Sequence, residues 1–582
     1  MSSNSNSKFS IFHRHYEHLL ELTLLPLLIA LVVWQSSRGS GAESAQVCRI
    51  IKYCCTSGAL VVSAASIPFL HCRPAASGIG PGVVAAGRIL LWAACILLAT
   101  VWILYRLEAG RQFWGMPGED VELVGGTLIS DASPDGRGGA RARLKLAAVK
   151  GRFGTSAQAS GTATVVFSRP LNLFMGCRLN IPAELLRLSS ADEAADEVDE
   201  VDEVDEVDGA SYLVHAQELP QTVGYSHALY KLRAYLMQDL QKRLQSVGRS
   251  APCLLQALLL GYRRNGAGGL AALFRRAGCA HLLALSGMHL GILSLGILIV
   301  LTPLAGRRLA LQLSFVTILA YLFLVGPRPS MLRAVLMYGV GVSAFLFLGL
   351  KVNPHYLLAV TFLLHVLFFP RNFEDLGFQL SYTALAGICG WTSIISRCLP
   401  TVIPRGVREG LAATIAAQCC TAALVVKSFG VLYPVGFISP LFLTPLVTIW
   451  MWSGLAYLAW TLFLSFCPPV FTAADLIGID LLFRGILEEA ALLTTASVRW
   501  WSGFRTLRIP EEQWPLVAVA SICVLTLFSL SQYAGRYGRR IKLQLSKIDR
   551  SVSAAEWDGA NPPLWAELPH FSAGSRENSR AA

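Results

Sequence analysis

The chain has few charged residues for its length. Of its 582 residues only 15% are charged, whereas 54% are hydrophobic. Soluble globular domains carry about 25% charged residues, so the composition excludes an ordinary soluble enzyme and indicates a membrane protein. The length also exceeds that of one compact domain.

Motifs of metal and nucleotide chemistry are missing as well. The 14 cysteines include no C-x-x-C pair, so neither a zinc site nor a disulfide framework is predicted. Most cysteines lie in apolar segments, where cysteine behaves as a small hydrophobe. The sequence also lacks the glycine-rich lysine loop of P-loop ATPases. We therefore predict no metal, no cofactor and no ATPase or other enzymatic activity.

The charges that remain are mostly basic. Lysine and arginine number 49 against 37 acids, a net charge of +12, and many of the acids are confined to the segment 192–208. A basic excess suits anionic partners such as lipid head groups or nucleic acid. In a protein with several membrane spans, the retention of basic loops in the cytoplasm is the more ordinary cause.

Apolar runs divide the chain into two membrane regions. An N-terminal region, 1–105, holds three apolar segments, and a larger region, 251–535, holds the others. Because a spanning helix needs ~20 apolar residues, we predict about twelve spans. In the larger region these lie near 282–304, 308–326, 331–350, 355–370, 376–396, 409–429, 433–448, 449–467 and 514–532. Glycine, proline and charge interrupt several of them, which is typical of bundles with broken helices.

The region 106–250 is not apolar enough to span the membrane, and its pattern predicts a small β domain. Polar and apolar residues alternate in Arg141–Leu146 and again in Thr162–Phe167, which predicts short strands of a barrel or sandwich. Four Asp-Glu-Val triplets follow within 192–208, and such dense like charge predicts a disordered spacer, with DNA mimicry as the alternative. The segment 229–247 then has the periodicity of an amphipathic helix.

Orientation can be predicted from the basic loops. If the N-terminus is cytoplasmic, the first three spans place 106–250 outside the cytoplasm, and the basic tail, 536–582, falls inside. The localisation predicted is therefore a membrane with several passes, an extracytoplasmic β domain and a cytoplasmic C-terminus.

Residues 273–291 carry polar groups that a lipid-facing anchor would exclude. Ser286 and His289 are spaced i and i+3, so on a helix they would share a face, and His281 would project the same way two turns earlier. A polar stripe of this kind predicts either the lining of a path or buried helix contacts. Gly287 and Gly291 would allow a neighbouring helix to approach closely. A Ser/His nucleophile is a weaker alternative, because no carboxylate lies nearby in sequence.

This stretch resembles the signature of the ComEC-type competence family, F-x-x-x-G-x-x-H-L-L-A-x-S-G-x-H-x-G. The residues in register are Phe274, Gly278, His281, Leu282, Leu283, Ala284, Ser286, Gly287, His289 and Gly291.

Two later segments strengthen the resemblance. Arg328 precedes a span that begins near an Arg-Ala pair, Arg333 and Ala334, and the family has such a pair after a small-residue loop. A guanidinium suits phosphate contact, although an arginine near a helix end could also extend toward the head groups. The segment Asp375–Ser381 matches the family pattern D-x-G-F-Q-L-S. Asp375 is expected to cap a helix, Gln379 and Ser381 to line a pore or pack inside, and Gly377 to serve helix packing.

The resemblance implies a fold and a function. The fold would be an α-helical polytopic protein of the bacterial cytoplasmic (inner) membrane, with an inserted extracytoplasmic OB-like domain at 106–250. The function would be passage of single-stranded DNA into the cytoplasm during natural competence. The candidate path residues are His281, Ser286, His289, Arg328, Arg333, Gln379 and Ser381.

The resemblance also implies partners. A DNA-translocating helicase, a nuclease and an extracytoplasmic DNA receptor would be separate proteins, besides membrane lipids and a possible homo-oligomer. The metallo-β-lactamase-like domain of many family members is not expected, because residues 534–582 contain one histidine and no H-x-H-x-D-H motif. The alternatives are a transporter of another anionic solute and a structural membrane protein of competence ancestry only.

Overall fold

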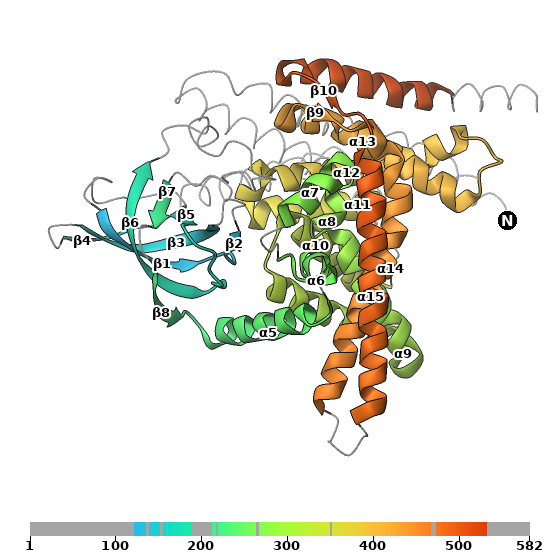
Figure 1. Ribbon diagram of the computed structural model, residues 1–582. Helices are drawn as coiled ribbons and strands as arrows, with labels where there is room; N and C mark the ends of the chain where they lie inside the picture. Colours follow the sequence, from blue (N-terminus) through green and yellow to red (C-terminus); the bar gives the residue numbers. More distant parts are fainter. Residues whose placement is uncertain are drawn as a thin grey trace, which may run out of the picture.

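The computed structural model is a helical body with a small β domain beside it (Figure 1). It describes residues 121–134, 139–151, 155–159, 161–187, 212–216, 219–248, 250–262, 267–349, 352–466 and 473–531. The predictions for 1–105, for the acidic segment 192–208 and for the tail 536–582 lie outside the described residues.

The β domain is built from strands whose inward side chains are apolar. Its elements are β1 (Val121–Leu128), β2 (Ser133–Pro134), β3 (Ala140–Gly151), β4 (Ser156–Gln158), β5 (Thr162–Phe167), β6 (Cys177–Arg187), β7 (Tyr212–Ala216) and β8 (Gln221–Tyr225). In β3 every second residue from Ala140 to Leu146 is buried, while Arg141 and Arg143 are partly exposed. The alternation in the sequence therefore predicted this strand correctly.

Five of these strands close on themselves. The pairings run β1–β3–β5–β7–β6 and return from β6 to β1, and they are antiparallel except for the parallel pair β5–β7. In this register Arg143 lies opposite Thr164. Val124, Leu144 and Ile181 fill the interior and are fully buried. Closure leaves no free edge between the five strands.

Helices make up the rest of the described chain. They are α5 (Ala228–Gln245), α6 (Ala251–Leu255) continued by the π-helix η2 (Gln256–Leu260), α7 (Ala267–Arg276), α8 (Ala280–Leu283), α9 (Gly287–Val325), α10 (Pro329–Leu348), α11 (Pro354–Phe368), α12 (Leu376–Cys398), α13 (Arg405–Phe429), α14 (Ser439–Phe466), α15 (Ala473–Ser502) and a helix at Trp514–Ser531. Short connections are η3 (Pro370–Glu374), β9 (Val431–Leu432), η4 (Pro434–Phe437), β10 (Leu507–Arg508) and η5 (Glu511–Gln513).

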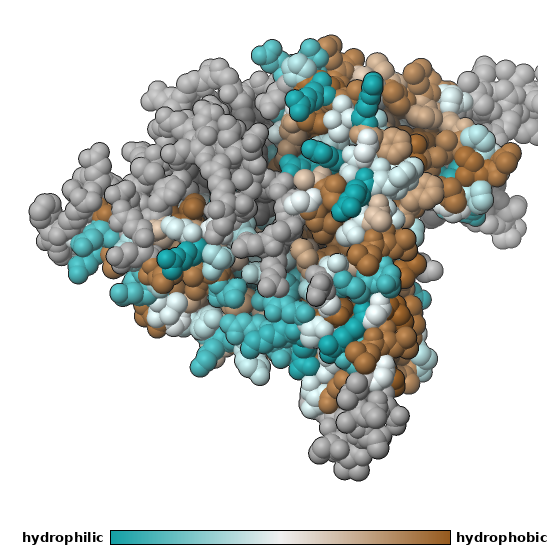
Figure 2. Space-filling view, viewed as in Figure 1, coloured by the Kyte–Doolittle hydropathy of each residue, from teal (hydrophilic) through white to brown (hydrophobic). Residues whose placement is uncertain are grey.

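Among the described helices, 5 are long and apolar enough to cross a membrane. They are Gly287–Val325, Pro329–Leu348, Arg405–Phe429, Ser439–Ser465 and Trp514–Ser531. Figure 2 shows apolar side chains over the side of the molecule formed by α14 and α15, whereas polar residues cover α5. The protein is thus a membrane protein, while the total of about twelve spans stays a prediction.

One segment of the helical body agrees in detail with the sequence prediction and two differ from it. Gly306 has non-helical backbone angles and divides α9 near the boundary predicted between 304 and 308. The separate spans predicted at 433–448 and 449–467 are wrong, because α14 runs through both and accommodates Pro445. The helix α15 was not predicted.

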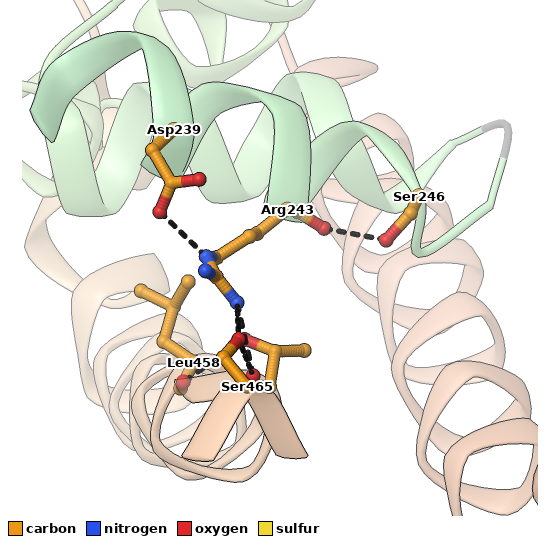
Figure 3. Close-up of polar contacts among 6 residues, drawn as sticks. Asp239, Arg243, Ser246, Leu458 and Ser465 are labelled. Atoms are coloured by element: carbon orange, nitrogen blue, oxygen red, sulfur yellow. Dashed lines mark hydrogen bonds and ion pairs between the residues drawn. The ribbon is translucent and has the colours of Figure 1, made fainter. Parts of the chain in front are cut away.

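The helix α5 connects the β domain to the helical body. Arg243, near its end, donates through Nη1 to the Thr461 carbonyl at 2.9 Å and to the Ser465 hydroxyl at 2.9 Å, both on α14 (Figure 3). Asp239 accepts from Nε of the same arginine at 2.7 Å. These contacts fix one end of α5 against the membrane helices.

Candidate anion path

A large cavity lies between the β domain and the helices. Its volume is about 1470 Å³, and its wall includes parts of β3, α5, the 278–291 segment, α10, α12 and α13. Among the described residues, seven arginines but only two aspartates line it. The arginines are Arg141, Arg143, Arg233, Arg275, Arg307, Arg328 and Arg333, and the aspartates are Asp131 and Asp375.

Both aspartates are engaged by the protein itself. Asp131 forms an ion pair with Arg233, with a Nη1–Oδ1 distance of 2.7 Å. Asp375 caps α12, because its Oδ1 accepts the Phe378 backbone N–H at 2.9 Å. The capping role expected of Asp375 is confirmed by this contact. The carboxylates therefore leave most of the positive charge of the wall unbalanced.

Three helices also begin at this cavity. The lining includes Ser286–Met288 at the start of α9, Arg328–Ser330 at the start of α10 and Asp375–Gly377 at the start of α12. The N-terminus of a helix carries a partial positive charge and unpaired N–H groups. Arginines and helix ends thus act in the same direction, and the cavity favours anions.

Ser286 and His289 do not share a helix face. Ser286 is the N-cap of α9: its Oγ accepts the Met288 N–H at 3.3 Å, and His289 reaches back so that its Nδ1 accepts the Ser286 N–H at 3.2 Å. Ser286 lines the cavity, but His289 is buried with 1% exposed and does not. In this structure His289 is not part of the cavity wall, because the helix begins after Ser286 and the ring completes the cap.

The same contact bears on nucleophilic chemistry. The Ser286 hydroxyl lies 3.3 Å from His289 Nδ1. The other ring nitrogen of His289, Nε2, is buried without a hydrogen-bond partner among the described residues. A Ser/His nucleophile needs a third group to orient the base, and the described structure provides none at this nitrogen.

Arg333 joins three helices at the cavity wall. Its Nη1 donates to the Ser381 carbonyl of α12 at 3.0 Å, and its guanidinium lies 5.9 Å from the centre of the Tyr382 ring. A Cβ atom at Gly287 would come within 3.2 Å of Arg333 Nη2. Gly287 therefore makes room for this guanidinium, and both Arg333 and Ser381 line the cavity.

Arg328 fixes the loops that surround the signature segment. Its Nη2 donates to the Gly261 carbonyl at 3.2 Å. Two residues later, the Ser330 hydroxyl donates to the Leu285 carbonyl at 3.0 Å. These bonds hold the start of α10 against the extended residues before α9, so Arg328 and Ser286 face the same space.

The remaining predicted residues divide between the cavity and the packed interior. His281 is exposed and lines the cavity. Gln379 does not line it: the side chain is 3% exposed and its Nε2 donates to the Phe373 carbonyl at 3.2 Å. The structure also differs from the helix-packing prediction at Gly291, where a Cβ would meet nothing within 4 Å, and at Gly377, where it would meet only Asp375.

Several lining residues were missed by sequence reasoning. Thr414, Gln418 and Thr421 of α13 line the cavity, and their i, i+4, i+7 spacing in an apolar helix was a readable signal. Arg275, inside the stretch 273–291, also lines it. Arg233 lines it too, but its separation in sequence from the signature gave no comparable signal.

Comparison with known proteins identifies the class of this helical body. Residues 258–533 match the model of the family described as Competence protein. The helical part of the chain within residues 258–533 is thus similar to the competence protein family, in agreement with the resemblance of its signature to the ComEC type. A relative, ComE operon protein 3 of Bacillus subtilis (strain 168), is 33% identical over 130 residues. That match covers 22% of this chain and 17% of the relative. No solved structure matches the chain.

Proposed function

We propose that this protein carries a single DNA strand through the arginine-lined cavity and across the cytoplasmic membrane during DNA uptake. The observation that supports this function best is the charge of the wall, where seven arginines face two aspartates that are already engaged. A strand of phosphodiesters presents one negative charge per nucleotide, and a basic groove is the usual way of holding it. The match of residues 258–533 to the competence family agrees with this cargo.

The β domain supports the same proposal. The closed order β1–β3–β5–β7–β6, with β5 parallel to β7, is a five-stranded barrel, and we infer that it is an OB-like barrel. OB folds bind oligonucleotides on the face of their second and third strands. Here those strands are β3 and β5, and Arg141, Arg143 and Thr164 on them line the cavity. The barrel would therefore receive the strand before the helices do.

The proposal includes an orientation and a division of labour. The barrel would lie outside the cytoplasm and the C-terminus inside, as the basic loops suggest. The chain itself would carry out no chemical step, and a helicase, a nuclease and a DNA receptor would be separate partners. Reporters fused after residue 210 and after Arg550 should then be active on opposite sides of the membrane.

The test is DNA uptake in a strain that lacks this chain, complemented with single variants. Arg328→Gln and Arg333→Gln each remove one charge from the wall, and we expect uptake to fall at least about tenfold in each. Arg333→Lys keeps the charge and should be milder. Arg499→Gln is the matched control, because Arg499 is an exposed arginine of α15 outside the cavity lining. Normal uptake with abundant Arg333→Gln protein would contradict the proposal.

The alternative is transport of another anionic solute, which the same cavity could bind. Uptake of labelled single-stranded DNA by the complemented strain separates the two functions. A strain whose DNA uptake does not depend on the chain, but whose growth on an anionic nutrient does, would favour the alternative.

A further inference from the structure

Two arginines of α5 attach this helix to its surroundings in different ways. Arg243 is partly exposed, with 23% of its side chain accessible, and pairs with Asp239 on the same helix. Arg233 is 1% exposed and pairs with Asp131, which belongs to the β domain. A buried charge is costly unless it is fully paired, so Arg233 has a stricter requirement for its partner.

The contacts of Arg233 connect three separate parts of the chain. Its Nη1 and Nη2 donate to Oδ1 and Oδ2 of Asp131, each at 2.7 Å. Its Nε donates to the Phe323 carbonyl near the end of α9 at 2.9 Å. Asp131 Oδ1 also accepts the Met175 N–H at 2.8 Å. One guanidinium therefore links the loop after β1, the loop before β6, the helix α5 and the end of α9.

Close packing surrounds this pair. The ring of Tyr230, one turn before Arg233, lies 5.8 Å from the ring of Phe323. A Cβ at Gly176, whose φ is +87°, would fall 2.3 Å from Cγ of Tyr230, so this barrel loop can approach α5 only with glycine. A second bond, from the Tyr262 hydroxyl to Asn172 Oδ1 at 3.2 Å, crosses the same boundary.

The pair also has a defined place along the cavity. Asp131 and Arg233 line it together with Arg141 and Arg143 of the barrel and with Arg328, the residue before α10. Since the two charges neutralise each other, the pair adds little attraction for an anion. Its bidentate geometry, however, fixes distance and angle between the barrel and the helices.

We propose that Asp131 and Arg233 form a docking joint that holds the basic face of the barrel in line with the helical part of the cavity. This role rests on the proposed function, because alignment matters only if one anionic strand contacts both parts. Asp131 and Arg233 are positioning residues here, and the strand itself is held by the other arginines.

A buried ion pair gives the joint a distinctive mutational pattern. Removal of one partner leaves the other charge buried and alone, whereas removal of both can be nearly neutral. Asp131→Asn keeps the acceptor for the Met175 N–H and removes only the charge. The double variant Asp131→Asn/Arg233→Gln removes both charges and leaves two amides that can pair.

The experiment measures hydrogen–deuterium exchange of the full chain in detergent or nanodiscs, together with DNA uptake. In Asp131→Asn, amides of segments 129–134 and 172–176 should exchange about tenfold faster than in the unaltered protein, and uptake should fall in parallel. In the double variant both should return to within about threefold of the unaltered protein. Asp239→Asn, which breaks the partly exposed pair on the same helix, is the control and should change neither segment.

The other outcomes contradict either the joint or the proposed function, and they can be told apart. Unchanged exchange in Asp131→Asn, or a double variant worse than the single one, would show that the two charges are not coupled. Faster exchange with normal uptake would show that alignment of the barrel is irrelevant, provided that Arg333→Gln reduces uptake. If Arg333→Gln has no effect either, the proposed function fails, while exchange still reports on the joint. Should Asp131→Asn not reach the membrane, Arg233→Lys, which keeps the charge without the bidentate fork, provides the same comparison.

Discussion

The signature segment, residues 273–291, has two sides with different roles. On the cavity side are His281, Ser286 and Gly291, which line the open space. On the packed side, His289 completes the cap of α9, and Gly278, although it also borders the cavity, lies against the backbone of Gly436. One short motif therefore contains both residues that line the cavity and residues whose packing holds that lining in place. A substitution on the packed side should therefore damage folding, and one on the cavity side should damage transport.

Two glycines of the motif offer the sharpest contrast and the largest expected effect. Gly278 has a φ of +70°, and a Cβ there would lie 2.4 Å from the Gly436 Cα, which is backbone and cannot rotate away. Gly291 has open space instead. We expect Gly278→Ala to destabilise the protein by about 2 kcal/mol or more, and Gly291→Ala by less than about 0.5 kcal/mol. Thermal unfolding in detergent measures both, and equal stabilities would erase the contrast.

The next effect concerns His289, whose ring completes the cap of α9. Since the loss of an N-terminal cap costs about 1 kcal/mol, His289→Ala should lower the stability by that order. Uptake per folded molecule should remain close to normal, because the ring does not line the cavity. Stability and uptake are compared after quantifying protein in the membrane. Normal stability with lost uptake would place His289 on the cavity side after all.

A smaller effect is expected at the barrel, where the cavity wall can be tested without disturbing the helices. Arg143→Ser removes one positive charge from β3. Each lost phosphate contact should reduce the slope of log affinity against log salt by about 0.7 for a single strand. Titration of the purified protein with a labelled oligonucleotide at several salt concentrations gives this slope. Arg499→Ser is the matched control, and an unchanged slope in Arg143→Ser would remove β3 from the path.

The smallest expected effect is the slow reaction of a buried thiol in the barrel. Cys177 is 4% exposed, and burial raises the pKa of its thiol. Because the thiolate is the reactive form, a raised pKa means less thiolate at neutral pH and slower reaction than for a free thiol. A maleimide should modify Cys177 only after unfolding, as peptide mass spectrometry would show. Rapid modification of the folded protein would mean that the barrel opens.

How far the sequence predicted the structure depended on whether a feature was local. The alternation around Arg141 and Arg143 gave β3, because a half-buried strand imposes a period of two. The capping role of Asp375 at the start of α12 was predictable for a similar local reason. The face of His289 was misjudged because spacing of three residues assumes a continuous helix, and Ala284 and Ser286 are extended.

Features that depend on distant segments were not predictable in this way. The sequence places Arg143, Arg233 and Arg333 far apart, and only the fold brings them to one cavity. The helix α15 escaped the hydropathy count because it contains charged residues, among them the pair Asp480 and Arg484, which are 2.6 Å apart on adjacent turns.

The central claim is that an anionic strand occupies the cavity beside the signature segment. It is tested most directly by a cysteine introduced at Ser286, after the native accessible thiols are removed, and labelled with a membrane-impermeant reagent. Ile292→Cys is the control, since Ile292 is 7% exposed and lies outside the cavity lining. The account predicts labelling at position 286 that added single-stranded DNA blocks and inorganic phosphate does not, with no labelling at 292. An unreactive position 286, or labelling that DNA leaves unchanged, would contradict the claim.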